Sequence, residues 1–330
     1  MEIGIIRELG GSGYDKRAIL LPPEVKKIVA AGHKVFVERQ TGSGLQIPDE
    51  EYAAAGATIV NTPQEALCRD LIVKLKAISS QESAMLKPGA IALAMIHQEQ
   101  SPHNAQALAD AGAVGVAMEA ICNEYGERYV DCTDMTGEQA MIFAFHLFPK
   151  IPSECKILVM GYGRVSTGAI LTASKLGASV RILRKSQYAN ITHFLKGIDM
   201  LVNGITWPKE MRDRKAYVVT RDMLKLMNRP AMIIDLSVDY PNPIETCRPT
   251  DMKEPVFEVD GVVHMDIYGY PALAPFSSAA RYSRQLLPII LEIGSKGLGN
   301  VDSYIANAIV CRQNLPLVVK KQVSNPKNES

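Results

Sequence analysis

The chain has 330 residues, of which 47% are hydrophobic and 22% are charged, and its formal net charge is +1. This size and composition suit a globular protein whose core is large enough for two domains. Because charges of one sign are neither in excess nor gathered in a run, the sequence argues against binding to nucleic acid or to a membrane surface. The apolar runs are too short to cross a bilayer, no signal peptide is recognisable, and the six cysteines form no CxxC pair. We therefore expect a cytoplasmic protein with free thiols, and we predict no metal site.

Short apolar runs alternate with helix-like segments in the first part of the chain. The runs "IGIIRE", "LIVKLK" and "IALAMI" are typical of buried strands. Between the strands, "PPEVKKIVAAG" begins with prolines and ends at glycine, as a helix commonly does. Strands that alternate with helices in this way predict a parallel sheet with both faces covered.

A second series of strands follows a predicted helix at residues 133–148. Its strands are "CKILVM", "SVRIL", "DMLVNGI" and "AMIIDLS", followed by a strong helix, "SSAARYSRQLLPIILEIG", and by "VDSYIANAIVC", which also has a helical pattern. The sequence predicts an α/β fold with two doubly wound, Rossmann-like domains, parallel sheets and an interdomain cleft. We expect residues 1–132 with about 297–330 to form a substrate (catalytic) domain, and residues 133–296 to form the nucleotide-binding domain.

A glycine-rich turn follows the first strand of the second series. Gly161 permits a tight turn, and Gly163 lets a pyrophosphate approach the N-terminus of the next helix, where free N–H groups favour an anion. Ser166 takes the third position of the usual GxGxxG pattern, and Gly168 comes two residues later. The spacing departs from the pattern, but the strand–turn–helix context favours a dinucleotide site over a turn without a ligand.

The next strand, "SVRIL", ends in basic residues. Arg184, Lys185 and Ser186 stand about twenty residues past the turn, where an acidic residue often holds the ribose of NAD. Positive charge and a hydroxyl favour the 2′-phosphate of NADP instead, although a solvated basic loop is the alternative. We predict NADP (NADPH) as cofactor, with contacts from Gly161, Gly163, Arg164, Val165, Arg184, Lys185, Ser186, Asn203 and Gly204.

Four ionisable residues stand where parallel strands end, which is where ligands of such sheets bind. Arg17, Lys76, His97 and Asp239 are the four, and each alone could be an ordinary loop or strand-end residue. Lys74 and Lys76 alternate onto one face of an apolar strand, where an unpaired ammonium is costly. Together the set offers a guanidinium for a carboxylate, a lysine for a carbonyl oxygen and an imidazole for proton transfer.

The chain resembles the alanine dehydrogenase and transhydrogenase amino-terminal family over nearly its whole length. The resemblance is carried by "KRAILLPPEVKKIVAAGHKVFVE", "SGLQIPDEEYAAAGATIV", "DLIVKLK", "KPGAIALAMIH", the glycine turn and "IIDLSVDYPNPIE". It implies that Arg17 is a substrate-binding arginine, His97 the catalytic histidine, and Lys76 and Asp239 their partners in the site. It also implies a homo-oligomer that acts on small-molecule substrates.

Several departures from alanine dehydrogenases make the chain similar to the carboxyethylornithine synthase branch. They include "KLKAIS" in place of the usual "KVKEP", "RKS" in place of an aspartate, and "YGYPALAP" in a late loop. This resemblance implies an NADPH-dependent reductive condensation of pyruvate with the amine of ornithine or lysine through an imine. Two alternatives stay open, an alanine dehydrogenase-type enzyme that uses ammonia and a non-catalytic NADP-binding sensor. For the amine pocket, the candidates are Glu119, Asn123 and Glu124, which could equally form a solvated strand end.

Overall fold

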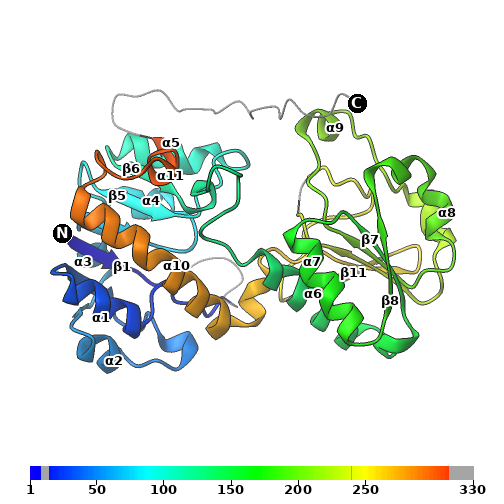
Figure 1. Ribbon diagram of the computed structural model, residues 1–330, viewed down its shortest axis with the longest axis horizontal. Helices are drawn as coiled ribbons and strands as arrows, with labels where there is room; N and C mark the ends of the chain where they lie inside the picture. The colour runs from blue at the N-terminus through cyan, green and yellow to red at the C-terminus, as the bar shows by residue number, and fades with distance from the viewer. Residues whose placement is uncertain (9–14, 239, 312–330) are drawn as a thin grey trace. The chain divides into compact units, whose positions relative to one another are not determined.

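The computed structural model describes residues 1–8, 15–238 and 240–311, and the chain divides into two compact units (Figure 1). Unit 1 holds the described residues of Met1–Leu9, Lys16–Asp131 and Ala279–Ser330. Unit 2 holds those of Gly10–Asp15 and Cys132–Ser278. The predicted fold class, two α/β units with mainly parallel sheets, is confirmed.

Unit 1 is built on a seven-stranded sheet with the order β13-β6-β5-β4-β1-β2-β3. Neighbouring strands are parallel, except that β13 pairs antiparallel with β6. Every residue of β4 and β5 is buried, as expected where both faces of a sheet are covered. The strands are β1 (Glu2–Ile5), β2 (Lys34–Glu38), β3 (Thr58–Val60), β4 (Leu71–Val73), β5 (Ile91–Ala94), β6 (Val114–Ala117) and β13 (Ile309–Cys311).

Helix α1 begins at the prolines where the sequence predicts a helix start. Three helices of unit 1, α1, α3 and α5, carry proline in the first turn, where its missing N–H costs nothing. Helix α3 packs closely on the sheet, because a Cβ at Gly4 would lie 1.9 Å from the carbonyl oxygen of Ala66. The helices are α1 (Pro22–Ala30), α2 (Asp49–Ala54), α3 (Pro63–Leu67), α4 (Ser80–Ser83), α5 (Pro102–Asp110) and α11 (Ser303–Ala306).

Two C-terminal elements differ from the sequence-based expectation. The long helix α10 (Pro275–Lys296) was expected in the nucleotide-binding domain, but from Ala279 onward it belongs to unit 1. One contact that joins α10 to unit 1 is made by buried Ser283, whose Oγ accepts a hydrogen bond from Leu21 N and donates one to Glu24 Oε2, both at 2.9 Å. The segment expected to be one helix forms α11 and then β13, which extends the sheet beside β6.

Unit 2 is built on a six-stranded sheet with the order β11-β12-β10-β9-β7-β8. All pairs are parallel except the β11–β12 hairpin. The strands are β7 (Lys156–Met160), β8 (Ser179–Leu183), β9 (Met200–Asn203), β10 (Ala231–Asp235), β11 (Val256–Val259) and β12 (Val262–Met265). The helices are α6 (Thr133–Leu147), α7 (Arg164–Lys175), α8 (Ile191–Leu195) and α9 (Lys209–Asp213).

Helices α6 and α7 run side by side in unit 2 (Figure 1). Their backbones touch at two glycines, since a Cβ at Gly137 would lie 2.1 Å from Val165 O and one at Gly168 would lie 1.9 Å from Asp134 O. Gly168 therefore serves helix packing, as the last glycine of a dinucleotide turn does. No helix in the described part of the chain is both long and apolar enough to cross a membrane.

Candidate functional site

Lys76 and His97 follow two neighbouring parallel strands of unit 1. Lys76 comes shortly after β4 and His97 shortly after β5, and both side chains are half-buried. The pairing continues past the strand ends, because Met95 N donates to Leu75 O at 3.1 Å. The two loops are therefore neighbours at the edge formed by the carboxyl ends of the strands, which we call the carboxyl edge.

A glutamate from the end of β1 holds the Lys76 loop. Glu8 accepts hydrogen bonds from Leu75 N at 2.5 Å and from Lys76 N at 3.2 Å. Strand β1 lies directly beside β4, so the carboxylate reaches across one strand spacing. Two consecutive backbone donors are satisfied, which fixes the backbone from which the Lys76 side chain extends.

A second glutamate holds the His97 loop in the same way. Glu119, in the 3₁₀ turn η2 (Met118–Ala120) after β6, accepts hydrogen bonds from His97 N and from Ile96 N, the latter at 3.1 Å. The φ angle of His97 is 50°, a left-handed conformation that residues other than glycine seldom adopt. Ser101 N donates to His97 O at 2.8 Å and holds the other side of the peptide. Such strained residues gather at functional sites, because only a surrounding network keeps them in place.

The structure gives the neighbouring Lys74 a different role. Lys74 is 2% exposed, and its Nζ lies 2.7 Å from both carboxylate oxygens of Glu82 in α4. Glu82 also completes a capping box with Ser79 at the start of that helix. Lys74 is therefore one half of a buried ion pair, and Lys76 is the lysine of this strand that stands at the carboxyl edge.

Arg17 lies at the same edge of unit 1 and is 8% exposed. Its neighbour Lys16 packs against Gly44, where a Cβ would lie 2.6 Å from Lys16 O. Gly44 belongs to the 3₁₀ turn η1 (Ser43–Leu45), which follows the carboxyl end of β2. The structure thus brings the segments of Arg17, Lys76 and His97 to one edge of the sheet. Asp239, the fourth predicted residue, lies outside the described residues.

Unit 2 presents a cradle of the kind that binds phosphate. Gly161 has a φ of 92°, and a Cβ there would lie 2.7 Å from Ile205 Cγ2. Gly163 is the N-cap of α7, and a Cβ there would meet nothing within 4 Å. Open space therefore lies at the N-terminus of a twelve-residue helix, beside Arg164 and Val165. Free N–H groups and the helix dipole favour an anion at this position.

The basic strand end lies next to this cradle. Strands β7 and β8 are parallel, with Met160 paired to Leu183, and Gly161 N donates to Leu183 O at 3.5 Å. Arg184, Lys185 and Ser186 follow immediately and are all exposed. The charges and the hydroxyl predicted to bind a 2′-phosphate therefore stand beside the glycine turn.

The other two predicted cofactor contacts, Asn203 and Gly204, interact with residues of the protein itself. Asn203 is fully buried, and its Nδ2 donates to Asp235 Oδ1 at 2.6 Å and to Ser237 Oγ at 3.1 Å. Gly204 makes room for Ser166, whose Oγ would lie 2.1 Å from a Cβ at that position. In this structure both residues position their neighbours.

Sequence reasoning missed the way in which Glu8 and Glu119 hold these loops. No local pattern signals that role, because each carboxylate accepts from the loop of a different strand. For the amine pocket, Glu119 is engaged with backbone N–H groups, and Asn123 closes a turn through Glu127 N at 2.9 Å. Within residues 1–8, 15–238 and 240–311, no three histidine, cysteine, aspartate or glutamate side chains are placed to hold a metal ion.

Comparison with known proteins agrees with this arrangement. Residues 4–138 match the alanine dehydrogenase/PNT N-terminal domain, and residues 183–315 match the C-terminal domain of the same family. Alanine dehydrogenase 1 of Staphylococcus aureus strain N315 is 27% identical over 338 residues, covering 90% of this chain and 89% of the relative. An L-alanine dehydrogenase structure superposes with a TM-score of 0.83 at 23% identity, covering 96% of this chain and 97% of that one. The transhydrogenase from Sinorhizobium meliloti gives 0.80 at 24% identity, with 96% and 99% covered. The chain therefore belongs to the alanine dehydrogenase and pyridine nucleotide transhydrogenase family, whose members are oxidoreductases that bind a nicotinamide nucleotide.

Proposed function

We propose that this protein is an NADPH-dependent oxidoreductase that reduces the imine formed between pyruvate and the amine of ornithine or lysine. The observation that carries the proposal is the exposed Arg184-Lys185-Ser186 strand end beside the open cradle at Gly163. A 2′-phosphate would receive two positive charges and a hydroxyl there, where an NAD site commonly has a carboxylate. The sequence resemblance to the carboxyethylornithine synthase branch supports the condensation chemistry.

The residues of unit 1 supply substrate binding and proton transfer. Arg17 would bind the keto-acid carboxylate, and Lys76 would donate to the carbonyl or carbinolamine oxygen. His97 would move protons as the amine adds and water leaves, a task suited to an imidazole. Asp239 would help to hold the nicotinamide ribose or to polarise the substrate. When bound, the cofactor supplies the hydride, and the protein orients it and excludes water.

The deciding experiment pairs pyruvate with ammonium, ornithine or lysine, each with NADPH and with NADH. We expect turnover with NADPH and one of the two diamino acids. Turnover with ammonium and NADH alone would overturn the proposal.

The basic strand end allows a separate test of cofactor choice. The double variant Arg184→Ala, Lys185→Ala should weaken NADPH binding by about tenfold or more, because hydrogen bonds to charged groups are lost, while NADH binding changes little. Lys196→Ala is the matched control, because Lys196 is also an exposed cation of unit 2. Equal losses for both nucleotides would argue against a 2′-phosphate site.

A second candidate is an alanine dehydrogenase-type enzyme that uses free ammonia. The relatives named alanine dehydrogenase favour it, since they match 90% of this chain. The same assay separates the two candidates. His97→Ala should abolish turnover in either one while nucleotide binding is kept, whereas unchanged turnover would point to a role that does not need His97.

A further inference from the structure

A buried carboxylate organises the loop after β10 in unit 2. Asp235 is fully buried and accepts hydrogen bonds from five donors, namely Asn203 Nδ2, Ser237 N and Oγ, Val238 N and Asn242 Nδ2. The shortest are 2.6 Å from Asn203 and 2.7 Å from Asn242. Among the described residues, no lysine or arginine hydrogen-bonds to Asp235. This carboxylate has no cation as partner, and it ties its own loop to the end of the neighbouring strand β9, so it needs an explanation beyond ion pairing.

The loop that Asp235 holds contains a strained residue. Val238 has a φ of 54°, and a β-branched side chain in the left-handed region is an outlier. Its N–H donates to Asp235 Oδ2 at 3.0 Å, so the carboxylate directly stabilises this conformation. Strain of this kind persists only where the surroundings determine it, and it is commonest at functional sites.

The loop is placed where a dinucleotide would extend. The sheet order reverses between β7 and β9, and in such folds the dinucleotide crosses the carboxyl edge at that point. With the basic strand end of β8 on the adenosine side, the nicotinamide half falls toward β9 and β10. Leu236, Ser237 and Val238 follow β10 at this side.

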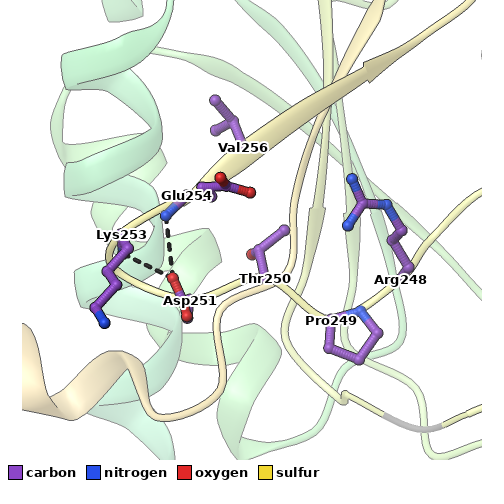
Figure 2. Close-up of a pocket in the computed structure, with 7 residues that line it drawn as sticks. All are labelled: Arg248, Pro249, Thr250, Asp251, Lys253, Glu254 and Val256. Carbon is purple, nitrogen blue, oxygen red and sulfur yellow. Dashed lines mark hydrogen bonds between the residues drawn. The ribbon is translucent and has the colours of Figure 1, made fainter. Parts of the chain in front are cut away.

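A second buried carboxyl lies next to Asp235. Asp266, just after β12, is fully buried; Tyr240 donates its hydroxyl to Oδ2, and Oδ1 has no hydrogen-bond partner. Thr250, in the wall of the surface pocket in Figure 2, accepts from Asp266 N at 3.0 Å and donates its own N–H to Asp266 O at 2.8 Å.

These surroundings keep Asp266 neutral. Burial, followed by the charge of Asp235, raises the pKa of Asp266 to about 9. Burial also raises the pKa of Asp235, but hydrogen bonds from Asn203, from Ser237 and from the Asp266 side chain oppose that rise. The other titratable groups facing the pair are Tyr240, Cys247 and Tyr270, and burial raises the pKa of each, so none is charged at neutral pH.

We propose that Asp235 is a positioning residue that holds the loop at 236–238 against the nicotinamide half of the bound dinucleotide. Asp266 supplies the protonated carboxyl that allows one buried negative charge to persist beside it. That the loop serves hydride transfer to an imine rests on the proposed function. That it contacts a bound dinucleotide rests only on the family to which the chain belongs.

The test compares Asp235→Asn, Asp266→Asn and Val238→Gly with Asp260→Asn, an exposed aspartate of the same unit, as control. Binding of NADPH and of adenosine 2′,5′-bisphosphate, which has only the adenosine half, is measured for each by calorimetry. In Asp235→Asn an amide faces amide donors, so NADPH binding should weaken about tenfold or more while the bisphosphate is unaffected. Asp266→Asn imitates the neutral acid and should keep both affinities within about threefold of wild type.

Three results would overturn the proposal. These are equal losses for both ligands in Asp235→Asn, an Asp266→Asn defect as large as that of Asp235→Asn, or unchanged NADPH binding in Val238→Gly. The last variant keeps the carboxylate and decides the matter if Asp235→Asn fails to fold. None of these measurements needs turnover, so a wild-type enzyme inactive with every amine tested would refute the proposed function without touching this inference.

Discussion

Two strand ends, one in each unit, use the same device for different purposes. His97 after β5 and Val238 after β10 both adopt left-handed backbone conformations, and in both a carboxylate accepts from the N–H of the strained residue. At His97 the carboxylate comes from Glu119, on a neighbouring strand end and half-exposed. At Val238 it comes from Asp235, on the same strand and fully buried.

The difference in burial explains why the two devices need different surroundings. Glu119 is only half-buried, so water can reach its carboxylate and the His97 loop needs no further group around it. Asp235 is fully buried, so the hydrogen-bond donors around its carboxylate must take the place of bulk water. The first device holds a residue whose side chain is suited to proton transfer, and the second holds the loop at 236–238, which we propose to lie against the nicotinamide.

The largest effect should follow from removing the carboxylate in unit 1. Glu119→Ala leaves Ile96 N and His97 N without their acceptor and frees His97 from its strained conformation. We expect kcat to fall by about 100-fold, since a loss of this kind corresponds to about 2.7 kcal/mol of positioning. Steady-state kinetics measure this loss. Glu127→Ala is the control, because that exposed carboxylate hydrogen-bonds within its own turn. An equal loss of kcat in the control would mean that Glu119 has no special role in positioning His97.

The next effect is the pH dependence of the free energy of unfolding that Asp266 of unit 2 contributes. The pKa of Asp266 is raised to about 9 in the folded protein, so between its ordinary value near 4 and 9 the folded state holds a proton that the unfolded state has lost. The contribution of Asp266 to stability is therefore full at low pH and is lost as pH rises, by at most about 1.4 kcal/mol per pH unit.

Asparagine cannot bind this proton, so the free energy of unfolding of Asp266→Asn should fall less steeply with pH than that of the wild type. Urea unfolding between pH 5 and 9 gives both free energies, and the difference between them should shrink as pH rises. A difference that stays constant with pH would mean that Asp266 is ionised in the folded state.

The comparison also assumes that the nucleotide lies along the carboxyl edge of unit 2, which Gly163→Ala tests. A methyl group at Gly163 meets no protein atom within 4 Å, so the free energy of unfolding should change by less than about 0.5 kcal/mol. The methyl group would occupy the open space of the cradle, so NADPH affinity should fall by about tenfold. Gly299→Ala, at a similarly open position in unit 1, is the control. Unchanged affinity would place the pyrophosphate elsewhere.

How much of this could be read from the sequence depends on how far apart the interacting residues are. Apolar runs and proline or glycine at helix ends are local signals, and they predicted the two α/β series. The segment that forms α11 and β13 was misread as one helix, because its strand exists only through pairing with β6. Likewise, the place of α10 depends on Ser283 meeting Glu24, which no local pattern encodes.

The same distinction applies to the site. Lys76 and His97 could be selected because parallel strands deliver their ends to one edge. Glu8 and Glu119 could not, since they act on loops of other strands, and the pairing of Asp235 with Asp266 joins residues on two strands. A left-handed conformation at His97 or Val238 is also invisible in the sequence, because neither residue type favours it.

The smallest expected effect is the difference in the free energy of unfolding between glycine variants of the two strained residues, Val238 and His97. Glycine relieves left-handed strain but loses more entropy on folding, so these terms nearly cancel at an ordinary residue. Valine is β-branched and is the more strained of the two, so Val238→Gly should raise the free energy of unfolding by about 0.5 kcal/mol more than His97→Gly does. Lys215→Gly, at an exposed residue with a φ of 50°, sets the baseline in the same urea titrations. If Val238→Gly instead lowers stability below that baseline, its side chain contributes more through packing than its backbone costs in strain. The loop after β10 would then be held mainly by apolar contacts, and its likeness to the His97 loop would be one of geometry alone.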